Sequence, residues 1–182
     1  MIEKIGKHVI DKIKDKKVFM DANILLYIFW PMGNPSWVKE YSSFFKDLLK
    51  QKIVIVTDRT TLSEFINRAL RYEYETHLRE NNLDKRSLPF KEFRDQNYGK
   101  ETVKEIYSIT KEKILNQFEY LDKSFSKEEV LEILDKENGD FNDQLIAKFC
   151  QENSLFFLTN DGDFKNTGID ILTANPILLN PD

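Results

Sequence analysis

Hydrophobic positions along the chain follow two patterns that predict different elements. Short, continuous apolar runs, which are typical of buried strands, occur at residues 18–20, 53–56 and 155–158, with a fourth at 171–172. Between these runs apolar residues recur every three or four positions, as they do in helices that bury one face. Strands and helices therefore alternate through the sequence.

Several local signals mark where the predicted helices begin. Residues 2–13 carry isoleucine and valine at helical spacing with lysines between them, which predicts an amphipathic helix. Asn34 is a favourable cap for a helix that starts with Pro35, and Ser126 with Glu129 has the pattern of a capping box. The alternation indicates a three-layer α/β/α fold, in which helices cover both faces of a mostly parallel sheet of about four to five strands.

Length and composition indicate one compact domain. The chain has 182 residues, 41% hydrophobic and 32% charged, and we expect residues 1–182 to form a single domain with a helical insertion or arm at residues 71–136. The apolar runs are too short to cross a membrane, and the N-terminal residues lack the apolar core of a secretory signal. With Cys150 as the only cysteine, we expect a cytoplasmic protein. Neither Cys150 nor His8 nor His77 has a sequence neighbour that suggests a ligand or a nucleophile.

The net charge bears on the choice of binding partners. Lys and Arg number 27 and Asp and Glu 31, so the formal charge of −4 argues against a protein that coats nucleic acid with its whole surface. Acidic residues that cluster would instead form a cation site, and bound divalent cations would offset their charge. Whether the excess of acidic residues repels nucleic acid or forms a cation site therefore depends on where these residues lie in the chain.

Acidic side chains follow the predicted strands or begin helices that start at the same edge of the sheet. In a parallel sheet these positions lie at the carboxyl edge, where functional sites form. Asp140 and Asp143 are three residues apart and so share one face of a helix. The acids at this edge are Asp21, Asp58, Glu64, Asp140, Asp143, Asp161 and Asp163.

A cluster of these carboxylates would have a specific chemical use. Carboxylates that converge at one site repel one another unless a cation or protons intervene, and an all-oxygen site suits Mg²⁺ or Mn²⁺. Divalent ions in such a site activate water and neutralise phosphate without a histidine base or a cysteine nucleophile. The pattern therefore indicates phosphoryl-transfer chemistry.

Each of these acids also has a structural alternative. Asp140 and Asp143 are placed to cap and complement the N-terminus of a helix, and Asp163 to stabilise a turn. We interpret Asp58 as the cap of the helix that follows it. Asp21 is the strongest functional candidate, because a charge directly after a buried strand and before an apolar run needs a partner.

Four short segments together resemble a known family. They are VFMDANILL at 18–26, SEF at 63–65, DFNDQLIA at 140–147 and LTNDGDF at 158–164. In this order and spacing they are similar to the PIN-domain ribonucleases, most of all to the toxin-type (VapC-like) members of bacterial and archaeal toxin–antitoxin pairs. The resemblance covers most of the chain, although its middle matches only in being helical.

The resemblance implies a Mg²⁺- or Mn²⁺-dependent endoribonuclease, in which a metal-activated water cleaves single-stranded or loop RNA. By this resemblance Asp21 and Asp143 bind the metal directly, and Glu64 binds it or orients the attacking water. The family's fourth acid corresponds to Asp161, acting through water, or alternatively to Asp163. The resemblance gives supporting roles to Asn23 and Thr159, which brace the site, and to Asp140, which is an added metal ligand or a cap.

The segment 71–136 is longer than the helical pair of the small toxins, and it interleaves cations with aromatic rings. This mixture favours an arm for single-stranded RNA, since cations meet phosphates and rings stack on bases. The alternatives are a solvated loop pinned by its aromatic residues, or a contact surface for an antitoxin. A toxin role, an antitoxin partner and a homodimer are implied by the resemblance alone. The candidate RNA-binding residues are Lys85, Arg86, Lys91, Arg94, Phe90 and Phe93, with Lys100 and Tyr98 beside them.

Two other functions are compatible with parts of the pattern. A PIN-like module that binds RNA or protein without cutting is disfavoured by the retention of all four acids, because a scaffold has no need of mutually repelling charges. A Mg²⁺-dependent phosphatase resembling the haloacid dehalogenases also opens with a strand and an aspartate, but it has a second aspartate two residues later. That position is Asn23 here, so the phosphatase is the weaker alternative.

Overall fold

The computed structural model describes residues 1–122, 124–135 and 140–180, and its centre is a parallel sheet. In this part of the chain six strands lie in the order β1-β6-β5-β2-β3-β4, and every neighbouring pair is parallel. The predicted α/β class is confirmed. The sheet exceeds the expected four to five strands because its edge strands, β1 and β4, are too short to leave an apolar run. The strands are β1 (Ile2–Lys4), β2 (Lys17–Met20), β3 (Val54–Thr57), β4 (Glu119–Tyr120), β5 (Phe156–Leu158) and β6 (Asp170–Thr173).

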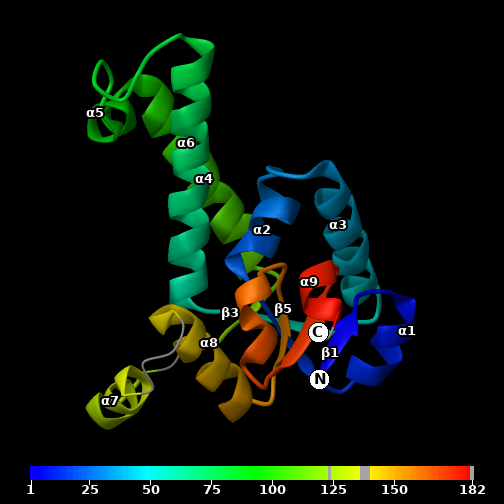
Figure 1. The fold of residues 1–182 in the computed structure, drawn as a ribbon. Coiled ribbons are helices and arrows are strands. Elements are labelled where there is room, and N and C mark those ends of the chain that lie inside the picture. Colours follow the sequence, from blue (N-terminus) through cyan, green and yellow to red (C-terminus); the bar gives the residue numbers. More distant parts are fainter. Residues whose placement is uncertain (123, 136–139, 181–182) are drawn as a thin grey trace.

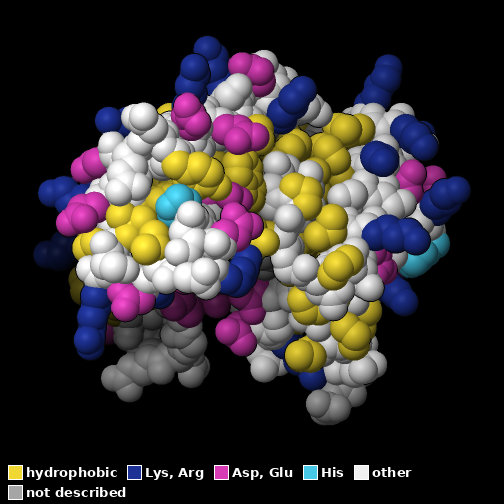
Figure 2. Space-filling model, turned by 90° about the horizontal axis from the view of Figure 1, so that it is seen from above, with side chains coloured by type: hydrophobic (Ala, Val, Ile, Leu, Met, Phe, Trp, Pro, Cys, Tyr) yellow, Lys and Arg dark blue, Asp and Glu magenta, His cyan; other side chains and the backbone are white. Residues whose placement is uncertain are grey.

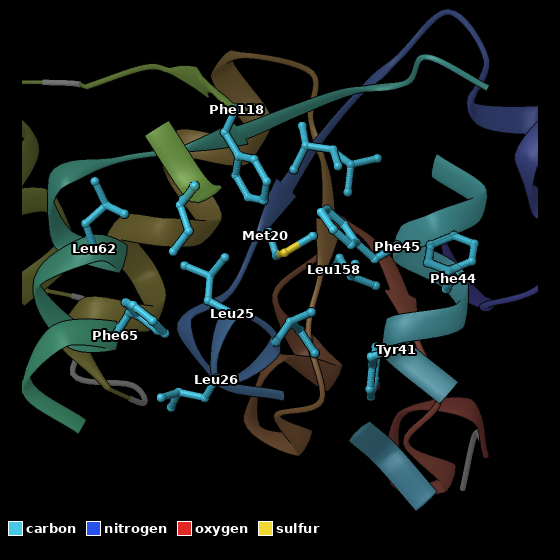
Figure 3. Packing of buried hydrophobic residues seen from close by; sticks show 14 of the residues in the cluster. Met20, Leu25, Leu26, Tyr41, Phe44, Phe45, Leu62, Phe65, Phe118 and Leu158 are labelled. Carbon is cyan, nitrogen blue, oxygen red and sulfur yellow. The ribbon is translucent and has the colours of Figure 1, made fainter. Parts of the chain in front are cut away.

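The central strand β2 buries side chains on both faces of the sheet. Val18 and Met20 belong to one hydrophobic cluster and Phe19 to a second one, because successive side chains of a strand point to opposite faces. Figure 3 shows Met20 and Leu158 of the sheet packed near Leu25 in the larger cluster. Burial on both faces explains why the strands appear as continuous apolar runs in the sequence.

Helices cover both faces of this sheet (Figure 1). Residues of the first four α-helices contribute to the larger cluster, and residues of α8, η3 and α9 to the smaller one. None of the helices in the described residues is long and apolar enough to cross a membrane. The helices on the first face are α1 (Lys7–Ile10), η1 (Asp11–Ile13), α2 (Ala22–Phe29), α3 (Pro35–Lys50) and α4 (Arg59–Glu80), and those on the second are α8 (Phe141–Glu152), η3 (Gly162–Asn166) and α9 (Pro176–Leu179).

Two predicted helix starts are confirmed. The side chain of Asn34 accepts a hydrogen bond from the backbone N–H of Ser36 at the start of α3, which has proline as its first residue. Ser126 and Glu129 form a capping box at the start of α7 (Lys127–Leu134). In both cases the side chain satisfies a backbone donor that the first helical turn leaves unpaired.

The segment 66–109, here called the arm, extends away from the sheet (Figure 1). It consists of most of α4 together with α5 (Phe90–Asp95) and α6 (Asn97–Ile109), which is followed by the π-helical segment η2 (Thr110–Leu115). The arm has an interior of its own, in which the rings of Tyr74 and Phe93 lie 5.2 Å apart. A Cβ atom at Gly99 would lie 2.1 Å from the carbonyl oxygen of Phe93, so only glycine fits the corner between α5 and α6.

Two segments differ from the helices that their spacing predicts. Residues 2–13 begin with β1, which pairs with β6, and only then form the short helices α1 and η1. The helical segment expected over 71–136 is interrupted by β4, which pairs with β3. In both places pairing with the edge of a sheet outweighs local helical spacing, because it satisfies backbone groups that the edge would otherwise leave open.

Candidate active site

Asp21 lies directly after β2, at the carboxyl edge of the sheet, and its side chain is only 8% exposed. Its backbone N–H donates to the carbonyl of Leu158 (3.0 Å), which ties it to the end of β5. Its carboxylate oxygen Oδ2 accepts hydrogen bonds from Thr159 Oγ1 (2.5 Å) and from Asn23 Nδ2 (2.7 Å). A buried carboxylate needs such donors, and here they fix its orientation.

The polar loop after β5 is held against the start of α2. Thr159 Oγ1 also accepts a hydrogen bond from the backbone N–H of Asp161 (3.0 Å), and the backbone N–H of Asn160 donates to Asn23 Oδ1 (3.3 Å). The structure thus places Asn23 and Thr159 in contact with each other and with Asp21. Both side chains donate to the carboxylate of Asp21, and their bracing role in the site stays a prediction.

Asn160 is a positioning residue that the sequence did not single out. Tyr41 Oη donates to its Oδ1 (2.8 Å), its Nδ2 donates to Tyr27 Oη (3.3 Å), and Asn175 Nδ2 donates to its backbone carbonyl (2.7 Å). These bonds connect α2, α3 and the end of β6 to the loop that carries Asp161. A polar run directly after an apolar strand is the signal that would have pointed to Asn160.

Five of the predicted acids line one cleft of about 580 Å³. They come from four separate segments of the chain, which only the sheet brings together. Asp163 is not in the lining among the residues that the structure describes, although its backbone N–H donates to Asp161 Oδ1 (3.0 Å). Asp161 is thus the better placed of the two candidates for the fourth acid. The acids in the cleft are Asp21, Glu64, Asp140, Asp143 and Asp161.

Two carboxylates of the cleft, those of Asp21 and Asp143, have raised pKa values. Burial raises the pKa of Asp21 to about 7, and the charges of Glu64 and Asp161 add to this rise, against the lowering effect of the hydrogen bond from Thr159. Burial also raises the pKa of Asp143 to about 6, with further contributions from the charge of Asp140 and other nearby acids. Cations in the cleft would relieve this repulsion.

Two of the cleft acids, Asp140 and Asp161, also have a structural role, because each caps the start of a helix. Asp140 Oδ1 accepts hydrogen bonds from the backbone N–H groups of Asn142 (2.8 Å) and Asp143 (3.4 Å), at the start of α8. The side chain of Asp161 caps η3. The predicted cap at Asp58 is confirmed, because its Oδ1 accepts a hydrogen bond from the backbone N–H of Thr61 (2.7 Å) at the start of α4. Within the described residues, the second carboxylate oxygen of Asp140 and of Asp161 accepts no hydrogen bond, so capping does not occupy it.

Glu64 reaches the cleft from the second turn of α4 and is paired with Arg68 (3.0 Å). Both side chains are about half exposed, so the pair is weak and Glu64 can be released to a ligand. Arg59 and Arg68 lie in the cleft lining, where they add positive charge. Neither arginine was predicted as a site residue, although the spacing of four residues between Glu64 and Arg68 is a usable signal.

The donor chemistry of the cleft fits a hard divalent cation. Carboxylate oxygens are the ligands that Mg²⁺ and Mn²⁺ take in proteins, and no sulfur or imidazole ligand lines the cleft in the described residues. In residues 1–122, 124–135 and 140–180, however, no group of three or more His, Cys, Asp or Glu side chains is arranged to hold a metal ion. The fit therefore concerns the kind of donor and its charge, not a finished coordination geometry.

The predicted RNA-binding residues of the arm differ in how accessible their side chains are to a ligand. Phe93 is completely buried, which corrects the expectation that its ring contacts RNA. Phe90 packs against the interior of the arm, with the guanidinium of Arg71 4.8 Å from its ring centre. Lys85 lies 3.5 Å from Glu75, which reduces the charge that it offers to a phosphate. Arg86, Lys91 and Arg94 are exposed.

A family model described as "PIN domain" matches residues 18–170 of the chain. This range includes all of β2 except Lys17, the strands β3 to β5, the start of β6 and all five acids of the cleft. No curated protein and no solved structure gives a significant match to the chain.

Proposed function

Because the chain belongs to the PIN-domain family, whose members are generally nucleases, we propose that it is an endoribonuclease that depends on Mg²⁺ or Mn²⁺. The observation that carries the proposal is the convergence in one cleft of five carboxylates, one of which is the buried Asp21. Burial, with added repulsion from the neighbouring acids, raises the pKa values of Asp21 and Asp143, and such perturbed groups are typical of sites built for a cation or a proton. A purely structural cluster would have no reason to retain this cost.

We assign the metal-binding role to Asp21 and Asp143, with Glu64 as a further ligand or as the group that orients the attacking water. Asp161 supports the site through water, and Asp140 is a cap that can add an oxygen ligand. When bound, the divalent ion would lower the pKa of a water and neutralise charge on the phosphate.

The chain's own contribution is to orient these groups. Thr159 and Asn23 both donate to Oδ2 of Asp21, so its carboxylate is held in one orientation before any ligand enters. Arg59 and Arg68 in the lining supply positive charge for a phosphate of the substrate. Since Arg68 is paired with Glu64, a phosphate that attracts Arg68 would also free Glu64 for its role at the water.

The finer expectations rest on the family resemblance alone. They are a toxin role with an antitoxin as partner and a homodimer. The expected cytoplasmic location rests instead on the single cysteine. Sedimentation over a range of concentrations tests the dimer, and growth after induced expression of the wild type tests toxicity. Asp21→Asn is the control in the growth test, because a toxic nuclease requires the acid.

Cleavage of labelled RNA tests the central proposal. We expect purified protein to cut a mixed population of RNAs with Mg²⁺ or Mn²⁺ and not with EDTA, and we expect Asp21→Asn to abolish cutting while it leaves the fold intact. Asp15→Asn, which removes an exposed acid outside the cleft, is the matched control. Equal residual cutting by wild type and Asp21→Asn would reject the assignment. RNA binding that persists in EDTA, without any cleavage under either condition, would instead support a non-catalytic module.

A further inference from the structure

A second hollow, here called the groove, lies on the arm between α4 and α6 and has a volume of about 420 Å³. Its lining includes Leu70 and Ile106, which are buried and apolar. Its polar lining consists of Asn67, Arg94, Lys100 and Tyr107. The groove therefore offers an apolar floor with cations, an amide and an aromatic ring around it.

The groove adjoins the candidate active site at Asn67. Asn67 lines both hollows, because it lies on α4 one turn after Ser63 and Glu64, which line the cleft. A ligand chain that leaves the cleft along α4 thus passes Asn67 and enters the groove. The two hollows differ in charge, since the cleft is lined by five acids and the groove by none of the acids that the structure describes.

The groove's cations are available to a ligand. Neither Arg94 nor Lys100 forms an ion pair with any residue in the described part of the chain, and both side chains are exposed. Figure 2 shows Lys and Arg side chains distributed around the visible face with acidic ones between them. Attraction of a phosphate chain therefore depends on local placement, as in the groove, and not on a uniformly basic face.

Tyr107 supplies a surface for a base. Its side chain is 57% exposed, so its ring is accessible beside the apolar floor. Aromatic rings next to cations are the elements that bind single-stranded nucleic acid, where rings stack on unpaired bases and cations track the backbone. Duplex RNA hides its base faces and would not use the ring.

We propose that the groove binds the unpaired strand of an RNA substrate whose scissile phosphate lies in the cleft. Arg94 and Lys100 contact backbone phosphates, Tyr107 stacks on a base, and Asn67 marks where the strand passes from groove to cleft. This proposal rests on the proposed function, because it takes RNA as the substrate. It assigns substrate contacts to the base of the arm, and of the cations expected from the sequence only Arg94 and Lys100 line the groove.

Binding measured without cleavage tests the groove. In an Asp21→Asn background, fluorescence anisotropy with a labelled single-stranded RNA should show a Kd that is at least about fivefold weaker for Tyr107→Leu and close to unchanged for Tyr107→Phe. The double variant Arg94→Gln/Lys100→Gln should also weaken binding and reduce the slope of log Kd against log salt by about 1.4. The matched control is Arg79→Gln/Lys46→Gln, which removes the same charges outside the groove and should change the slope less.

The outcomes distinguish a failure of the groove proposal from a failure of the proposed nuclease function. Unchanged RNA binding in the groove variants, equal binding of duplex and single-stranded RNA, or no RNA binding by Asp21→Asn would overturn the groove as a strand-binding site. If instead binding depends on the groove but the wild type fails to cut RNA with any divalent metal, the proposed function fails and the groove stands.

Discussion

The hydroxyl of Thr159 donates a hydrogen bond of 2.5 Å to Oδ2 of Asp21, although 138 positions separate the two residues in the sequence. The same hydroxyl oxygen accepts from the backbone N–H of Asp161. One threonine at the end of β5 thus joins the two acids that follow neighbouring strands. Its loss would disturb the orientation of Asp21 and the loop that carries Asp161.

We expect Thr159→Val to reduce both stability and cleavage. The substitution keeps the shape of the side chain but leaves the buried carboxylate of Asp21 and the N–H of Asp161 with one partner fewer, at a cost of about 1–3 kcal/mol. Urea denaturation measures the loss of stability and single-turnover cleavage the loss of rate. Thr159→Ser retains the hydroxyl and should recover most of both, so an equal defect in the two variants would contradict a role for the hydrogen bond.

The raised pKa of Asp21 predicts a pH-dependent stability of the metal-free protein. The ordinary value is 3.8 and the folded value about 7, so the folded state binds this proton more tightly than the unfolded state. The contribution is therefore fully present below about pH 4 and is lost as the pH rises through 7. Since one pKa unit corresponds to about 1.4 kcal/mol, the loss can reach about 4 kcal/mol.

Asp21→Asn isolates this effect, because asparagine can accept the hydrogen bond from Thr159 without carrying a charge. Denaturation in EDTA at several pH values should show that the variant loses less stability than the wild type between pH 4 and 8, and that it is the more stable protein at pH 8. Parallel curves for the two proteins would show that Asp21 does not titrate in this range.

Metal binding should depend on pH through the same group of acids. The pKa of Asp143 is raised to about 6 and that of Asp21 to about 7, and a cation must displace both protons. We expect the rise in Tm on adding Mn²⁺ to be large at pH 8 and small at pH 5.5. The rise should disappear in Asp21→Asn/Asp143→Asn and persist in Asp15→Asn. An equal rise in all three proteins would place the metal elsewhere.

Glu64→Gln should separate activity from stability. Its ion pair with Arg68 is exposed, so we expect the free energy of unfolding to change by less than about 1 kcal/mol. Cleavage should fall at least about tenfold, since a group that binds the metal or orients water is lost. Arg68→Gln breaks the same ion pair, so we expect its free energy of unfolding to be close to that of Glu64→Gln. A large loss of stability in either variant would show that the pair is structural.

Gly99→Ala should disrupt the corner between α5 and α6. The added Cβ would lie 2.1 Å from the carbonyl oxygen of Phe93, so backbone must move and we expect a loss of more than about 1 kcal/mol. Hydrogen exchange measures whether the loss is confined to the arm. Glu101→Ala, an exposed change on the same helix, is the control and should leave exchange in the arm unaltered.

The sequence by itself determined the layers of the fold and pointed to all five acids that line the cleft. Runs such as residues 18–20 are apolar throughout because helices cover both faces of the sheet. Such runs can therefore be recognised as buried strands from the sequence alone. Asp21, Asp143 and Asp161 follow strands or start a helix at the same edge, so their convergence follows from the parallel order of the strands.

Only the tertiary structure decided which side chains are available to a ligand. Phe93 and Tyr107 both appear as aromatic residues in a charged helical segment, yet one is buried in the arm and the other is exposed beside the groove. Likewise, Asp163 follows Asp161 by two residues but does not line the cleft in the described residues. Sequence spacing fixes which face of an element a residue occupies. Whether that face meets solvent, a ligand or another helix depends on packing between segments that are distant in the chain.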